Sequence, residues 1–330
     1  MSVKASAPGN IFFAGEHAVV YGYPAVVTAV DLRAYCTASI LKSRSIIVES
    51  RELGKAKASL KSEKVLNRHG KKELYIFFDL IEILIKKHGI KRGIRLSIES
   101  DVPVESGLSS STAVLSASLH ALNLLFDFGI KKEDFFKYLY PLQVKVHGGK
   151  ASGSEILSSS FGGYHKIQKI GSEGKISLSF ENLGVHRFSV VIGNTNIRAP
   201  TALTVGMHMP SLIRRYPEFV QKQFKKIALI CNSIEKALQT EDEPLLGSLM
   251  NKNQKILSKL GLSHPKLDDC IKEALNAGAL GAKLSGGGWG GVMFALAKNG
   301  TEKKIAKAIE STGAQAIITK IGVEGVKECE

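Results

Sequence analysis

The sequence predicts a mixed α+β fold, and three observations lead to that prediction. Small and β-branched residues run through residues 3–48, as is typical of strands. Apolar residues recur at helical spacing in residues 76–88 and through most of residues 210–260. Turns rich in glycine or serine join such segments at residues 101–111 and 281–291. With 330 residues, the chain is long enough for one or two domains with a proper core.

The first half is expected to hold a strand-rich sheet followed by helices. A first strand is expected to be interrupted at Pro8-Gly9, and residues 51–75 are polar and lysine-rich, which predicts an exposed loop or hairpin. Residues 147–167 are dense in glycine and serine and are expected to form a loop. The expected strands are residues 3–14, 25–30, 35–48 and 93–100, and the expected helices are residues 76–88, 114–122 and 132–146.

The second half alternates between the two kinds of element. Most of residues 210–260 is expected to be helical, with a break near Asp242–Pro244. The further expected helices are residues 267–277 and 303–311, and the expected strands are residues 177–181, 187–193, 292–297 and 315–321.

The composition narrows the class of protein. The net charge of +15 comes largely from dispersed lysines and arginines, so we rank a solvated basic surface first, an anionic small-molecule ligand second and nucleic acid third. The four cysteines have no paired spacing, which predicts free thiols in a reducing compartment and no zinc site. No apolar run reaches about 18 residues and no signal-peptide core is present, so we expect a cytoplasmic protein that does not enter the membrane.

The stretch from Asp101 to Leu122 is the most informative. A turn with Gly107 and three serines runs straight into a helical pattern, which leaves backbone N–H groups and the positive end of the helix dipole pointing at open space. Such a helix start binds anions, usually phosphate. The alternative is a serine that caps an ordinary helix. The turn is neither a Walker A sequence nor a Rossmann fingerprint, so a nucleotide would be bound in another way.

Three further features are candidates for chemistry. Glu16-His17 follows a strand and would grip a substrate hydroxyl or carboxylate, or would be a surface turn. Glu155 is a lone acid among glycines and serines, which suits a general base, although a surface turn explains it equally. The glycines of residues 281–291 would form a phosphate-side loop or a tight hairpin.

Together, three stretches resemble the GHMP kinase superfamily. They are APGNIFFAGEHAVVYGYPAV (7–26), PVESGLSSSTA (103–113) and KLSGGGWGGVMFAL (283–296), and GEHAVVYG (15–22) resembles the mevalonate kinases of archaea. The resemblance spans essentially the whole chain. It implies a two-domain fold, with an N-terminal domain at residues 1–187, a C-terminal domain at residues 188–330, and ATP and substrate in the cleft between them.

The resemblance also implies an activity and site residues. The activity is ATP- and Mg²⁺-dependent phosphorylation of the 5-hydroxyl of mevalonate, in the mevalonate pathway of isoprenoid synthesis. Glu155 would be the catalytic base with Asn10 beside it, Lys150 is a candidate for binding the γ-phosphate, and Ser111 would bind the metal. The ATP-binding residues would be Pro103, Gly107, Leu108, Ser109, Ser110, Ser111, Ser285, Gly286, Gly287 and Gly288. The substrate-binding residues would be Glu16, His17, Ser152, Gly153 and Thr201.

The chain departs from the family at several of these positions. Asn10 stands where the family usually has lysine, Glu155 where it has aspartate and Trp289 where it has glycine; the region of Gln143 lacks the family's acidic Mg²⁺ ligand. Two alternatives therefore stay open. One is a kinase of a phosphorylated mevalonate, such as mevalonate 3-phosphate; the other is a weakly active homologue that acts as a binding module. The sequence does not determine the oligomeric state, and a homodimer stays open.

Overall fold

The computed structural model describes residues 2–103, 107–146, 151, 153–170, 177–198 and 203–329. Helices and strands are mixed along the chain, as the sequence predicted. The strands are β1 (Ser2–Ala14), β2 (Ala25–Leu41), β3 (Ser45–Ser50), β4 (Gly54–Lys61), β5 (Lys64–Gly70), β6 (Gly93–Ser100), β7 (Tyr164–Ile170), β8 (Ser177–Gly184), β9 (Phe188–Asn194), β10 (Gly281–Ser285), β11 (Val292–Leu296), β12 (Gln315–Ile321) and β13 (Lys327–Cys329).

The helices fall into two groups separated in the sequence. The α-helices are α1 (Tyr75–His88), α2 (Ser110–Phe126), α3 (Phe135–Val146), α4 (Ser154–Phe161), α6 (Met209–Arg215), α7 (Pro217–Gln239), α8 (Glu243–Lys259), α9 (Pro265–Asn276) and α10 (Glu302–Ser311). Short helical turns are η1 (Ala18–Tyr21), η2 (Lys72–Leu74), η3 (Lys132–Asp134) and η4 (Thr204–His208). In the described part of the chain, none of the helices combines the length and the apolar character that crossing a bilayer requires.

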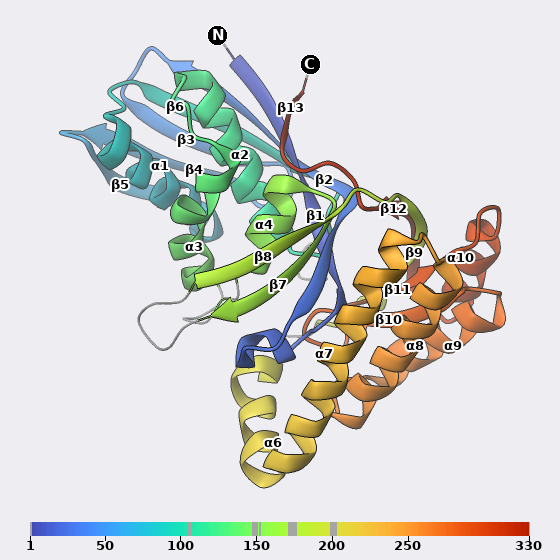
Figure 1. Cartoon of the computed structure of the whole chain (residues 1–330). Helices are drawn as coiled ribbons and strands as arrows, with labels where there is room; N and C mark the ends of the chain where they lie inside the picture. Colours follow the sequence, from blue (N-terminus) through green and yellow to red (C-terminus); the bar gives the residue numbers. More distant parts are fainter. Residues whose placement is uncertain are drawn as a thin grey trace.

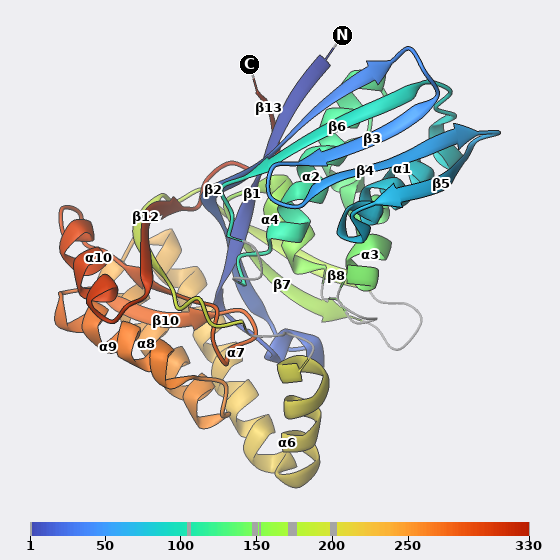
Figure 2. The same cartoon turned by 180° about the vertical axis from the view of Figure 1, so that it is seen from behind.

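The described strands belong to one sheet whose middle is the long strand β2. The order is β10-β11-β9-β12-β2-β6-β3-β4-β5, while β1 pairs with β2 and β13, and β7 pairs with β2 and β8. Strands β1 and β2 run between a group of helices α1–α4 and a second group α7–α10 (Figure 1). Seen from behind, β3, β4, β5 and β6 lie side by side at one end of the sheet, and the two chain ends lie together (Figure 2).

The buried core is divided between the same two groups of helices. One buried cluster joins α1, α2 and α3 to the strands β3–β6, and another joins α7–α10 to β9–β12 and the end of β1. The predicted domain boundary between residues 187 and 188 falls between β8 and β9 and stays a prediction. The described cysteines are free, as expected.

Two expectations about local structure were wrong. Strand β1 is not interrupted at Pro8-Gly9 but continues through it with a shift of register against β2. Part of the expected loop at residues 147–167 is the helix α4, followed by β7. At residues 281–291 the hairpin, one of the two forms expected, is present: the buried strand β10 pairs antiparallel with β11, and the glycines connect them. Strand β1 tolerates Pro8 because the shift of register occurs there, and bulges are where a sheet accepts proline.

Gly9 explains why β1 can carry a functional site. A Cβ atom at this position would lie 2.8 Å from the carbonyl oxygen of Leu108, so only glycine lets the serine-rich turn lie against the strand. The backbone N–H of Asn10 then donates to that carbonyl at 3.1 Å. The turn is thereby fixed to the centre of the sheet.

Candidate active site

The serine-rich turn at residues 107–109, which we call the serine turn, leads into α2 as expected. However, Ser109 does not cap this helix. Ser109 is in the left-handed region (φ 58°), and its side chain makes no hydrogen bond to the backbone of the first turn. Its hydroxyl instead donates to Oδ1 of Asn10 at 3.1 Å. The alternative of an ordinary serine cap is therefore wrong, and the first N–H groups of this 17-residue helix are not satisfied by that side chain.

The serine turn and the glycine loop lie against each other. We call residues Ser285–Gly288 the glycine loop. A Cβ atom at Gly107 would lie 3.2 Å from the carbonyl oxygen of Ser285, and one at Gly286 would lie 3.4 Å from Cα of Gly107. Glycine at both positions lets the two backbones approach, as a shared phosphate site would require.

Glu155 lies in the first turn of α4, not in a loop. Its Oε2 accepts a hydrogen bond from the hydroxyl of Thr112 on α2 at 3.2 Å and one from Nε2 of Gln143 on α3. The same Nε2 donates to the Thr112 hydroxyl at 3.1 Å, which closes a triangle of contacts. Three helices therefore fix one carboxylate. We call these three side chains the carboxylate cluster.

Asn10 connects the carboxylate cluster to the serine turn. Its Nδ2 donates to the backbone carbonyl of Glu155 at 3.4 Å, while its Oδ1 accepts from Ser109. The structure thus brings together Asn10 and Glu155, which the sequence paired only by resemblance. The sequence did not identify Thr112 and Gln143 as partners of Glu155. Neither side chain is unusual by itself, and the three residues meet only when α2, α3 and α4 pack together.

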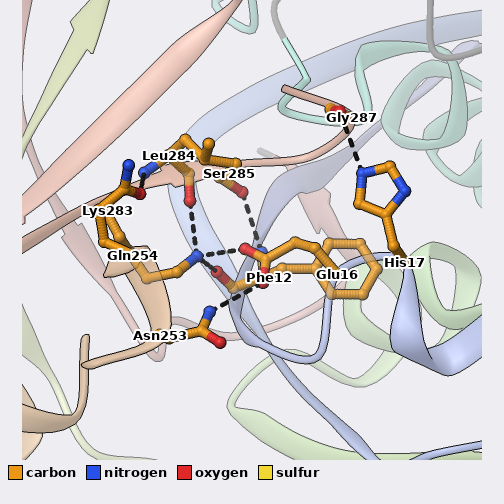
Figure 3. Close-up of polar contacts among 9 residues, drawn as sticks. All are labelled: Phe12, Glu16, His17, Asn253, Gln254, Lys283, Leu284, Ser285 and Gly287. Atoms are coloured by element: carbon orange, nitrogen blue, oxygen red, sulfur yellow. Dashed lines mark hydrogen bonds and ion pairs between the residues drawn. The ribbon is translucent and has the colours of Figure 1, made fainter. Parts of the chain in front are cut away.

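Glu16 and His17 are buried, so the alternative of a surface turn is wrong. Nε2 of His17 lies 3.0 Å from the carbonyl oxygen of Gly287 in the glycine loop (Figure 3). Because a carbonyl only accepts, Nε2 carries the proton and Nδ1 is left as an acceptor. Nδ1 is buried and has no hydrogen-bond partner in the described part of the chain. Burial lowers the pKa of His17 to about 4, so the ring is neutral at pH 7.

Glu16 binds a lysine that the sequence did not single out. Lys283, the middle residue of β10, forms a buried ion pair with Glu16, whose other carboxylate oxygen accepts from Asn253 on α8 at 3.1 Å (Figure 3). Burial raises the pKa of Glu16 and lowers that of Lys283, while each charge opposes the shift of the other.

Trp289 directly follows the glycine loop in the sequence. It has a positive φ of 62°, where the resemblance leads one to expect glycine. Its indole N–H donates to the carbonyl of Gly261 at 2.7 Å, and its ring contacts His208 edge to face at 5.0 Å between centroids. These contacts offset the backbone strain, which costs roughly 1–2 kcal/mol.

The remaining candidate residues are only partly described. Pro103 is half-buried between β6 and Gly107, and Gly153 is the residue before α4, with φ 77°. Ser110 and Ser111 open α2. Ser152, Thr201 and Lys150 lie outside the described residues. Within the described ranges, no group of three or more His, Cys, Asp or Glu side chains could hold a metal by itself.

Known proteins match the chain along nearly its whole length. The model of the GHMP kinase N-terminal domain matches residues 75–163, and that of the GHMP kinase C-terminal region matches residues 234–315. The mevalonate kinase of Pyrococcus furiosus is 34% identical, with 99% of this chain and 98% of that protein covered. The mevalonate kinase of Archaeoglobus fulgidus is also 34% identical, with 89% and 92% covered.

Solved structures agree on the fold. The mevalonate kinase of Methanococcus jannaschii has a TM-score of 0.82 at 24% identity, with 97% of this chain and 98% of that chain covered. The mevalonate kinase of L. major, solved with R-mevalonate, has a TM-score of 0.81 at 22% identity, with 96% and 95% covered. The two family models and the full-length relatives above 30% identity lead to one conclusion: the chain belongs to the GHMP kinase family, with the mixed α+β fold of those kinases.

Proposed function

We propose that the protein transfers the γ-phosphoryl group of ATP to the 5-hydroxyl of mevalonate. Membership of a kinase family implies the use of ATP. The mevalonate kinases among the relatives supply the choice of substrate. The observation that carries the proposal is the carboxylate cluster, because it holds one acid in place beside the turn where phosphates would bind.

Glu155 is the proposed base. Gln143 and Thr112 both donate to its Oε2, which suits the ionised carboxylate that a base needs. Asn10 joins Glu155 to Ser109, so the acid is held at a set distance from the serine turn. Phosphoryl transfer depends mainly on such positioning and on stabilisation of charge.

The phosphates of ATP would lie between the serine turn and the glycine loop. The N-terminus of α2 offers N–H groups and the positive end of a helix dipole. The close contact of Gly107 with the glycine loop places a second backbone beside the first. The proposed contacts are Pro103, Gly107, Leu108, Ser109, Ser110, Ser111 and Ser285–Gly288.

A magnesium ion fits this arrangement with help from the nucleotide. Gln143 Oε1 is buried without a hydrogen-bond partner in the described part of the chain, so an oxygen ligand is left over at the carboxylate cluster. Together with the proposed ligand Ser111 and the oxygens of ATP, it satisfies the preference of Mg²⁺ for few protein ligands plus phosphates and water. The ion would neutralise charge on the phosphates.

His17 supports a hydroxylated substrate. Its neutral ring presents a buried Nδ1 without a partner in the described structure, which would accept a hydrogen bond from a substrate hydroxyl. Gly153, Ser152 and Thr201 are the further residues proposed to line the substrate side.

An assay of ADP release tests the proposal. The panel is mevalonate, its 3- and 5-phosphates, homoserine and galactose, each with ATP and Mg²⁺. We expect turnover with mevalonate, and in Glu155→Gln a loss of kcat of about 10²- to 10⁴-fold. The matched control is Glu310→Gln on the exposed surface of α10, which should turn over normally. Turnover only with a phosphorylated mevalonate would refute the substrate assignment, and unchanged kcat in Glu155→Gln would refute the base.

A further inference from the structure

We propose that Lys283 and Glu16 are positioning residues that hold the glycine loop against strand β1. The inference rests on the proposed function, because it assigns the two residues to the nucleotide side of the same site. It also changes the role of Glu16 from lining the substrate pocket to placing the loop. Neither side chain needs to touch substrate or nucleotide for this role.

Lys283 uses its whole ammonium group to connect separate parts of the chain. Its Nζ binds Glu16, the carbonyl of Phe12 at 3.1 Å and the carbonyl of Leu284 at 2.5 Å. An ammonium has three N–H donors, so each one is used. Lys283 is completely buried and lies two residues before the start of the glycine loop. A flexible surface lysine could not fix a neighbouring loop in this way.

The carboxylate of Glu16 is likewise fully used in contacts within the protein. One carboxylate oxygen binds Lys283 and the other accepts from Asn253. Both oxygens therefore already have donors inside the protein (Figure 3). Since Glu16 is 2% exposed and Lys283 is completely buried, either partner left alone would be a buried charge without compensation. Replacing both residues together leaves no isolated charge, whereas replacing only one of them would destabilise the folded protein.

Two more contacts join the same two segments. The backbone N–H of Phe12 donates to the hydroxyl of Ser285 at 3.1 Å, and His17 donates to the carbonyl of Gly287. Residues 12–17 thus hold residues 283–287 at the ion pair and at two positions of the glycine loop, Ser285 and Gly287. Because Gly286 packs on Gly107, the position of the loop also sets its distance to the serine turn.

The test removes both charges together and measures nucleotide binding directly. The variant is Glu16→Gln/Lys283→Met, which preserves side-chain volume and leaves no isolated charge. Trp289, the single tryptophan of the chain, lies next to the loop and reports binding by its fluorescence during titration with ADP. We expect the Kd for ADP and the KM for ATP to rise at least tenfold, while kcat at saturating ATP falls less than threefold.

The control is a different ion pair, which connects a strand to a helix. Lys166 on β7 and Glu235 on α7 pair at 2.6 Å, and their side-chain hydrogen bond is to each other rather than to the glycine loop. Lys166→Met/Glu235→Gln should leave the Kd for ADP unchanged. If the buried double variant loses thermal stability yet binds ADP like the wild type, the pair is only structural and the inference is overturned.

A milder variant decides the matter if the double variant does not fold. Asn253→Leu removes the donor to Glu16 but keeps the ion pair, and the Asn253 side chain bonds Glu16 rather than the glycine loop. We expect the Kd for ADP to rise about three- to tenfold, and an unchanged value would overturn the inference. The ADP titration needs no mevalonate, so a protein that binds ADP without phosphorylating mevalonate would refute the proposed function alone.

Discussion

Acidification should destabilise the protein through His17. Its pKa is lowered to about 4 by burial, against 6.5 for an exposed imidazole, so the unfolded chain binds a proton that the folded chain refuses between these values. A depressed folded pKa gives stability that is present above pH 6.5 and is lost as the pH falls towards 4. For one group with these two pKa values, the loss between pH 7 and pH 5 is about 2 kcal/mol.

The assay is urea denaturation at pH 7 and pH 5 for the wild type and for His17→Asn. Asparagine suits the site because His17 has a φ of 61°, a region that asparagine tolerates. The variant loses the bond to Gly287 at both pH values, but its difference between them should be smaller by about 2 kcal/mol. His69→Asn on the exposed strand β5 is the control and should keep the wild-type difference. An equal pH dependence in wild type and His17→Asn would refute the reasoning.

Two further substitutions test the packing and the carboxylate cluster. Gly15→Ala would place a Cβ atom 2.2 Å from that of Ala25, so it should cost about 3 kcal/mol or more of unfolding free energy by urea titration. Gly129→Ala, with positive φ but open space, should cost only about 1–2 kcal/mol, and equal losses would contradict the clash. Gln143→Leu should lower kcat about 100-fold, because Glu155 loses one of its donors and Mg²⁺ loses its proposed ligand Oε1, while the affinity for ADP measured without Mg²⁺ should stay unchanged. A kcat within threefold of wild type would show that Gln143 does not position the acid.

The elements with clear periodicity were predictable. Strands β6 and β12 have the predicted bounds, and in β6 the apolar residues Ile94, Leu96 and Ile98 alternate along one face. The polar segment at residues 51–75 contains the hairpin of β4 and β5, one of the two forms expected. Helix α4 was missed because its serines suggest a loop. All four of them, Ser154 and Ser158–Ser160, are buried, and Ser159 donates to the carbonyl of Pro8 at 3.0 Å.

The candidate site was predictable only in part. The motifs pointed to Glu16, His17 and Glu155, because Glu16-His17 follows a predicted strand, Glu155 is a lone acid among glycines and serines, and the resemblance assigns all three to the site. Their partners could not be found in this way. Lys283 is 267 residues from Glu16, and only folding makes their contact visible. The roles of the site residues, Mg²⁺ binding, the cytoplasmic location and the homodimer stay predictions.

The end of β1 and the turn that follows it set the geometry of the whole candidate site. Gly9 admits the serine turn, Asn10 holds Ser109 and the backbone of Glu155, and residues 12–17 hold the glycine loop. Strand β1 pairs with β2 along its length and with β13 near its start, so it has little freedom to move. A misplacement of about 1 Å can cost roughly 100-fold in rate. The serine turn, the glycine loop and Glu155 all contact the same rigid strand and the turn after it. Their positions relative to one another are therefore fixed with the precision that phosphoryl transfer needs. Replacement of the family lysine by Asn10 is compatible with this role, since the role depends on hydrogen bonds rather than on charge.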